Sequence, residues 1–292
     1  MSISASMVKE LRERTGAGMM ECKKALVETG GDMDAAVEQL RKSGQAKADK
    51  KAGRIAADGR VVIAAGSTGA AIVEINSETD FVANDENFVA FSDAVADAAL
   101  GSGSADVAAL NEQALADGRT VEQARTELVA KVGENISVRR VAQIEAGDQL
   151  GSYIHAGSKI GALVALTGGD ETLARDVAMH VAAINPTCLD ESGVPAEMLE
   201  KERRIITEEA QASGKPDNIV EKMVAGRMAK FLKDITLLGQ PFVKDDKLTV
   251  GKLLADAGAT VTGFIRFEVG EGIEKKEENF VDEVMKQVKG GA

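Results

Sequence analysis

Apolar residues recur at intervals of three and four over the first forty residues, in three short groups that glycines separate. This spacing predicts helices over residues 7–14, 19–29 and 33–43, because each helix would then have one apolar face. Asp32 precedes the third helix and can cap it with its side chain. Three helices of this length make a minimal bundle, which is marginally stable alone and typical of a docking module.

This bundle and the segment after it form the first predicted domain, residues 1–54. The glycine-containing first loop and the Gly31-Asp32 entry to the third helix resemble the ubiquitin-associated (UBA-like) fold. Residues 42–54 are basic and rich in alanine, with almost no large apolar side chains. We therefore expect a partly helical, solvated linker here rather than a binding site.

From residue 60 the pattern changes to apolar runs and alternation, which predict strands. A hairpin followed by a helix occurs twice, and the turn of each hairpin contains Ala-Gly-Ser, at 65–67 and again at 156–158. This repeat predicts two similar α+β subdomains packed side by side. The predicted strands and helices are 60–65, 70–76, 86–100 and 135–145 in the first unit, and 153–156, 160–167 and 172–184 in the second, with a further alternating strand over 261–269.

Two more helical features lie in the C-terminal half. A charged helix over 196–211 and a return helix from Asn218 predict an antiparallel hairpin, which its charged faces would direct into solvent as a spacer or a self-association arm. The tail over 279–288 is amphipathic and can pack on its own chain or on a partner. We therefore expect an α+β fold in five parts. These are the UBA-like domain and linker (1–54), core subdomain N (55–147), core subdomain C (148–185 plus 236–265), the inserted coiled-coil hairpin (186–235) and a C-terminal helical module (266–292).

The stretch over residues 77–85 stands out because it carries Phe81 on a turn between a predicted strand and a predicted helix. Aromatic residues make up only 3% of the chain, and polar residues would suffice for a turn. Phe81 could fill the core or could be an anchor for a partner. The corresponding turn of the second unit, at Gly168-Gly169-Asp170, has no aromatic residue, which weakens the core interpretation without excluding it.

Composition narrows the class of protein. The 292 residues carry a net charge of −12, which argues against a nucleic-acid-binding surface. The apolar runs are too short to span a bilayer, and the first residues lack the layout of a signal peptide. The two cysteines have no CxxC spacing, which is consistent with thiols in a reducing compartment. We expect a cytoplasmic protein without membrane contact.

Catalytic chemistry is hard to assemble from this sequence. There are only two histidines, His155 beside a turn and His180 within an apolar helix face, and no nucleophile is apparent near His155. No phosphate-binding loop of either common type is present. We therefore expect a binding protein with no metal and no cofactor, and we interpret His180 as a buried or half-buried structural residue.

Several blocks of the sequence resemble the bacterial elongation factor Ts family. Residues 8–26 are similar to the family's N-terminal signature, and Thr79-Asp80-Phe81-Val82-Ala83 is similar to its second signature. Further similar blocks are 179–183, 226–228, 240–242 and 263–272, in the same order as in the family.

The resemblance implies a guanine nucleotide exchange factor for elongation factor Tu, the GTPase that delivers aminoacyl-tRNA. It further implies that the hairpin is a coiled-coil arm and that the tail is a C-terminal module. The residues implied to disturb the partner's Mg²⁺ site are Thr79, Asp80, Phe81 and Val82. Those implied to contact the partner elsewhere are Lys9, Arg12, Met19, Met20 and His155.

The residues alone leave two other hypotheses open. A UBA-like adaptor with an α+β scaffold would bind its main partner through residues 1–54 alone. A small-molecule enzyme that uses His155 would lose turnover when His155 is replaced. A dimer, or a complex of two factors with two GTPases, also remains open.

Overall fold

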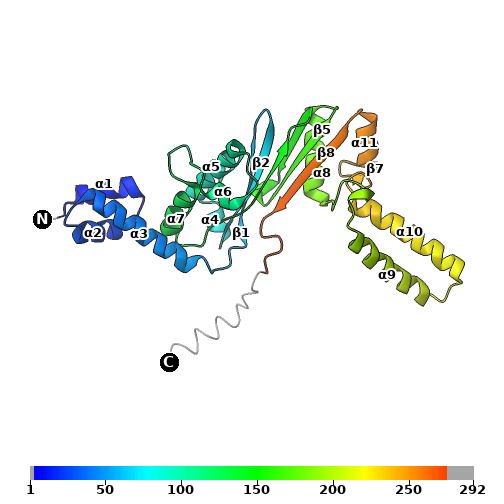
Figure 1. The fold of residues 1–292 in the computed structure, drawn as a ribbon, viewed down its shortest axis with the longest axis horizontal. Coiled ribbons are helices and arrows are strands. Elements are labelled where there is room, and N and C mark those ends of the chain that lie inside the picture. The colour runs from blue at the N-terminus through cyan, green and yellow to red at the C-terminus, as the bar shows by residue number, and fades with distance from the viewer. Residues whose placement is uncertain (1–2, 275–292) are drawn as a thin grey trace, which may run out of the picture.

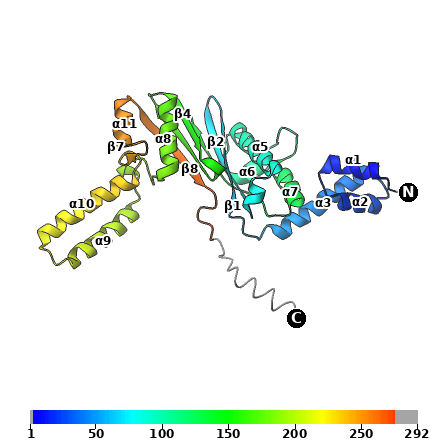
Figure 2. The same ribbon diagram turned by 180° about the vertical axis from the view of Figure 1, so that it is seen from behind.

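The computed structural model describes residues 3–274, so the amphipathic tail predicted over 279–288 lies outside the described residues. Helices and antiparallel sheets are both present, which confirms the α+β class. Within this range no helix is both long enough and apolar enough to cross a membrane. Figures 1 and 2 show an elongated molecule with the N-terminal helices at one end, two sheets in the middle and a helical hairpin at the other end.

The N-terminal helices are α1 (Ala5–Thr15), α2 (Met19–Glu28) and α3 (Met33–Lys51). The side chains of Ser4 and Asp32 cap α1 and α3 by accepting hydrogen bonds from backbone N–H groups of their first turns. Buried apolar residues from all three helices form a shared core, namely Val8, Leu11, Cys22, Ala25, Leu26 and Ala36. The three helices therefore pack on one another, while their likeness to the UBA-like fold stays a prediction.

The linker predicted after the third helix is wrong in one respect. Helix α3 does not end at residue 43 but continues to Lys51, and Gly44 and Ala48 on it are buried. A Cβ atom at Gly44 would lie 3.5 Å from the Cβ of Ala130 on α7 (Val121–Val132). Because alanine and lysine favour helix and small residues permit close approach, residues 42–51 form a helix that packs on the body.

Two three-stranded antiparallel sheets form the centre of the molecule (Figure 1). The first has the order β1-β2-β3 and the second the order β4-β5-β8. Helix α5 covers the first sheet, α7 packs against α5, and α8 covers the second sheet. The bounds are β1 (Asp58–Ala65), β2 (Gly69–Ser77), β3 (Ser137–Glu145), α5 (Glu86–Ser102), β4 (Gln149–Ile154), β5 (Ile160–Thr167), α8 (Glu171–Ile184) and β8 (Thr260–Glu268).

The shorter elements connect these layers. The sequence places the boundary between subdomain C and the C-terminal module after residue 265. Strand β8 includes residues on both sides of this boundary. The short elements are α4 (Asp80–Ala83), α6 (Val107–Asn111), β6 (Pro241–Phe242), β7 (Asp245–Thr249), α11 (Val250–Asp256) and the 3₁₀ turns Ala156–Ser158 and Glu191–Gly193.

The hairpin consists of α9 (Ala196–Ala212) and α10 (Asp217–Ile235). Figures 1 and 2 show both helices extending away from the sheets. Buried Ile206, Ala210 and Val220 lie on the hairpin, and an ion pair of 2.7 Å joins Arg227 to Glu209 across it. The two helices therefore pair with each other.

The two sheets face each other across an apolar layer, so β2 is covered on both sides and all its residues are buried. Val61 and Ile72 from the first sheet belong to this layer, together with Leu163 and Phe267 from the second. Gly161 on β5 lies at a point of closest approach, because a Cβ atom there would lie 2.6 Å from Cγ1 of Val61. The distance between the sheets therefore depends on glycine at this position.

A buried carboxylate also joins the first sheet to the chain beyond β8. Glu74 on β2 accepts hydrogen bonds from the Gly270 N–H (2.8 Å), the Asn76 amide (3.0 Å) and the guanidinium groups of Arg139 and Arg140. A bulge in the pairing of β2 with β3 brings both consecutive arginines to the same carboxylate. Burial alone would raise the pKa of Glu74, but hydrogen bonds from Gly270, Asn76 and Arg140 outweigh it and hold that pKa below its ordinary value.

The closeness of the sheets leads to a stability prediction. Gly161→Ala should lower the free energy of unfolding by about 1–3 kcal/mol, because the added methyl group overpacks the layer between the sheets. Gly263→Ala on β8 is the matched control: its Cβ would lie 3.5 Å from Ile144, an ordinary contact, so a change within about 0.5 kcal/mol is expected. Urea unfolding of both variants measures the difference, and equal stabilities would contradict the packing described here.

Candidate functional site

The loop that carries Phe81 begins where β2 ends at Ser77 and leads through α4 into α5. The hydroxyl of Thr79 caps α4 by accepting a hydrogen bond of 3.4 Å from the Val82 N–H. Ala83 is buried and Val82 packs against the core, so this side of the turn faces inward. The opposite side holds Phe81, whose side chain points away from the protein body.

Phe81 is 85% exposed, so the interpretation of Phe81 as a core residue is wrong. Burying a side chain of this size against apolar surface is worth about 1.5–3 kcal/mol, and that stabilisation is still available to a partner. Asp80 beside it is also exposed, and its carboxylate has no hydrogen-bond or ion-pair partner among residues 3–274. The loop therefore presents an aromatic ring and a free carboxylate on a structured turn.

The four N-terminal candidates lie on α1 and α2. Met19 and Met20, in the first turn of α2, are 60% and 74% exposed. Arg12 and Met19 together line a shallow cavity at the loop between α1 and α2, next to Ala130 of α7. Lys9 lies one turn earlier on α1, where it pairs with Glu13 at 3.7 Å on the surface. This end of the molecule thus offers flexible apolar side chains beside positive charge, which suits contact with another protein.

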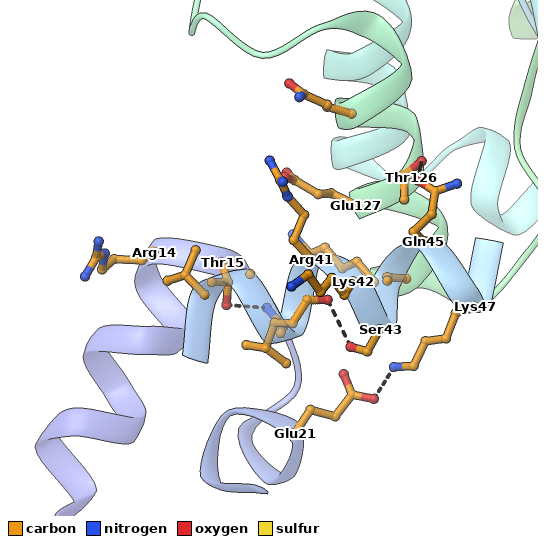
Figure 3. A pocket seen from close by; sticks show the side chains of 18 residues that line it. Arg14, Thr15, Glu21, Arg41, Lys42, Ser43, Gln45, Lys47, Thr126 and Glu127 are labelled. Carbon is orange, nitrogen blue, oxygen red and sulfur yellow. Dashed lines mark hydrogen bonds and ion pairs between the residues drawn. The ribbon is translucent and has the colours of Figure 1, made fainter. Parts of the chain in front are cut away.

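A second pocket, of about 420 Å³, lies where the α1–α2 loop, α3 and α7 meet. Figure 3 shows Arg41, Lys42 and Glu127 around it, with Lys47 paired to Glu21 at its rim. Neither Phe81 nor His155 lines this pocket. It is the seam at which the N-terminal helices join the body.

His155 lies apart from these groups, just after β4 and at the start of the turn Ala156–Ser158. Its ring is exposed, and Nδ1 lies 3.3 Å from the hydroxyl of Tyr153. The turn itself is tightly bent, with Gly157 and Ser158 at positive φ. His155 can therefore contact a partner, but a hydrogen bond to tyrosine does not activate it as a base. Over the described part of the chain, no cluster of three or more acidic, histidine or cysteine side chains could hold a metal ion.

Comparison with known proteins identifies the family. The elongation factor TS family model matches residues 78–271, a segment that begins at the Phe81 loop and includes β3 of the first sheet and all three strands of the second. The chain is 62% identical to elongation factor Ts of Thioalkalivibrio sulfidiphilus, covering 99% of this chain and all of the relative. It is 60% identical to that of Methylococcus capsulatus and 57% identical to that of Legionella pneumophila (strain Paris), with 99% of each chain covered.

The chain belongs to the elongation factor Ts family. The resemblance described above is thereby confirmed, and the chain is a translation elongation factor by family. The family model starts at Glu78, so Lys9, Arg12, Met19 and Met20 lie outside its match, whereas the full-length relatives align with that region as well.

Two residues that were not predicted as site residues from the sequence hold the Phe81 loop in place. Glu134, in the turn between α7 and β3, accepts hydrogen bonds from the backbone N–H (3.0 Å) and the hydroxyl (2.7 Å) of Thr79. The next residue, Asn135, donates its N–H to Glu78 at 2.6 Å. No sequence signal could have revealed these pairs, because the partners are more than fifty residues apart and Glu134 lies in an ordinary polar turn.

His180 plays a structural role, as the sequence suggested. It is buried on α8, where Nε2 lies 3.0 Å from Oε1 of Gln240 and Nδ1 accepts the N–H of Val243 at 3.2 Å. The Gln240 amide nitrogen donates to the Asp234 carbonyl, so Oε1 is the atom that faces the ring and Nε2 carries the hydrogen. Burial lowers the pKa of His180, which the hydrogen bond to Gln240 only partly opposes.

A pH dependence of stability is expected from the buried histidine. The unfolded chain protonates this side chain below about pH 6.5 while the folded chain keeps it neutral, so the unfolded state binds more protons there. The free energy of unfolding should therefore fall by up to about 1.4 kcal/mol for each unit of pH below 6.5, until the folded group also protonates. Urea unfolding between pH 7.5 and 5.5 measures this slope, because this range lies on both sides of the ordinary histidine pKa of about 6.5.

The chain offers a matched control, because His155 is its other histidine. His180→Gln should lose the slope, whereas His155→Gln should keep it. A slope that survives in His180→Gln would show that another group is responsible.

Proposed function

We propose that this chain is a guanine nucleotide exchange factor for elongation factor Tu and that it acts by binding, without catalytic chemistry of its own. The observation that carries the proposal is the 85% exposure of Phe81 on a turn that is capped and tied to the protein body. An apolar ring held in water is stabilised when a partner buries it. The family membership supports elongation factor Tu as that partner.

In the proposed mechanism, Thr79, Asp80, Phe81 and Val82 form a wedge. Phe81 inserts between elements of the GTPase that position Mg²⁺, and Asp80 makes a polar contact beside it. Mg²⁺ bridges the nucleotide phosphates and neutralises their charge, so displacing it weakens nucleotide binding. By linkage the effect is reciprocal, and nucleotide that rebinds expels the factor.

One aromatic side chain limits what the loop can do alone. About 1.5–3 kcal/mol from burying Phe81 corresponds to about tenfold to somewhat over a hundredfold in an equilibrium. A larger acceleration needs further contacts. The exposed Met19 and Met20, with Lys9 and Arg12, are the proposed second contact at one end of the molecule. The exposed His155 is the proposed third, on the second sheet unit.

The remaining parts have proposed roles in this scheme. The helices α1–α3 form the UBA-like docking domain, the two sheet units are subdomains N and C, and α9 with α10 forms the coiled-coil arm. The factor works in the cytoplasm, without membrane or nucleic-acid contact and without a cofactor. The proposed complex contains either one factor for each GTPase or two factors with two GTPases.

The wedge is tested by Phe81→Ala in a GDP-release assay. Release of labelled GDP from elongation factor Tu should slow by about tenfold to a hundredfold, because the burial of one phenylalanine is lost. Ile55→Ala is the control, since it truncates another exposed apolar residue (43% exposed) outside the proposed contacts. It should leave the rate within about twofold of the wild type.

A very small and a complete loss of exchange in Phe81→Ala would each contradict one part of the proposal. A loss of only severalfold in Phe81→Ala would refute a dominant wedge. Complete loss of exchange would refute a function that is distributed over several contacts.

A further inference from the structure

The geometry points to Glu134 as a positioning residue that holds the Phe81 loop in its binding conformation. This inference rests on the proposed function, because the loop's partner is the one proposed above. Glu134 itself does not need to touch that partner. It acts on Thr79, two residues before the exposed ring.

The contact between Glu134 and Thr79 is bidentate. Oε2 of Glu134 accepts the Thr79 N–H at 3.0 Å, and Oε1 accepts the Thr79 hydroxyl at 2.7 Å. A carboxylate is suited to this task because it only accepts, and its two oxygens can receive two donors at once. Both hydrogen-bond donors of Thr79 are therefore directed to one side chain from another part of the chain.

The hydrogen bond that the Thr79 hydroxyl donates to Glu134 also fixes the direction of the hydroxyl's lone pairs. Since the hydroxyl hydrogen points to Glu134, a lone pair is left to accept the Val82 N–H at 3.4 Å. The Ala83 N–H donates to the Thr79 carbonyl at 3.2 Å, and the hydroxyl of Ser77 donates to the same carbonyl at 2.8 Å. Every polar group of Thr79 is thus engaged in forming the turn from which Phe81 projects.

The turn that carries Glu134 is itself tied to the end of α3. Asn135 donates its side-chain amide to the Arg54 carbonyl at 2.8 Å, and Lys51 donates to the Gly133 carbonyl. Asn135 also donates its N–H to Glu78, and Glu78 pairs with Arg54 at 3.5 Å. The α7–β3 turn is therefore a junction between the helix that leads from the N-terminal domain and the loop that carries Phe81.

This arrangement has a consequence for binding. A loop that is ordered before it meets a partner loses less conformational freedom on binding, so more of its contact energy appears as affinity. Without the carboxylate, Thr79 keeps only hydrogen bonds to its neighbours in the chain, and Phe81 samples other directions. The contribution of Glu134 is then expressed through Phe81 and should vanish when the ring is absent.

The test is a double-mutant cycle on GDP release from elongation factor Tu. Glu134→Ala should slow release by about three- to tenfold in the wild-type background, the scale of a partly exposed charge-assisted hydrogen bond. In the Phe81→Ala background the same substitution should change the rate by less than about twofold. Glu134→Gln, which keeps the shape and one strong acceptor, should retain part of the wild-type rate.

The matched control is Glu112→Ala, which removes an exposed glutamate just after α6 whose side chain makes no hydrogen bond or ion pair within residues 3–274. It should leave release unchanged in both backgrounds. An equal loss from Glu134→Ala with and without Phe81 would overturn the inference, because Glu134 would then act independently of the ring. No loss in the wild-type background would overturn it as well.

A measurement on the free protein separates this inference from the proposed function. Amide hydrogen exchange at Val82 and Ala83 should be about three- to tenfold faster in Glu134→Ala than in the wild type, without faster exchange in β2. Unchanged exchange at these amides would overturn the positioning role. If the wild-type chain fails to release GDP while these amides do respond, the proposed function is wrong and Glu134 is only a structural anchor, which also overturns its role in exchange.

Discussion

The architecture depends on the burial of β2 between two layers. Helix α5 covers one face of this strand and the second sheet covers the other, so all of its residues are removed from water. Glycine at position 161 lets the sheets approach, and the carboxylate of Glu74 joins β2 to β3 and to the chain beyond β8. A strand held on both faces is a rigid support for the loop at its end.

The loop at the end of β2 carries Phe81. The protein leaves this ring in water although it has an apolar core a few residues away, where Val82 and Ala83 are packed. The two inward residues and the hydrogen bonds of Thr79 hold the turn, so the ring has a defined direction without being buried. An exposed aromatic side chain on a rigid turn is typical of a residue that contributes much of the binding energy of an interface. The loop is already ordered in the free protein, so it loses little conformational entropy when it binds.

Much of this could be predicted from the sequence, and the limits have physical causes. The strand before Phe81 and the turn can be predicted from local patterns, and the structure has them. Local patterns leave Asn84 and Asp85 as alternative caps of the next helix, and the structure shows that Asp85 is the cap. Helix α3 was predicted too short, because the apolar spacing stops near residue 43 while Gly44 and Ala48 continue the packing with almost no side chain. The exposure of Phe81 could not be decided from its neighbours, since it depends on which side of the turn faces the core. The contact of Thr79 with Glu134 joins residues far apart in the chain, so only the folded structure reveals it.

The most direct test of the central claim uses the unmodified chain. Labelled GDP bound to elongation factor Tu is mixed with an equal amount of the chain and an excess of unlabelled GDP, and loss of the label is measured over time. The account predicts release that is faster by about tenfold or more than the spontaneous rate, since the burial of Phe81 alone supplies that much. An unchanged rate, with a folded chain and active GTPase, would contradict it.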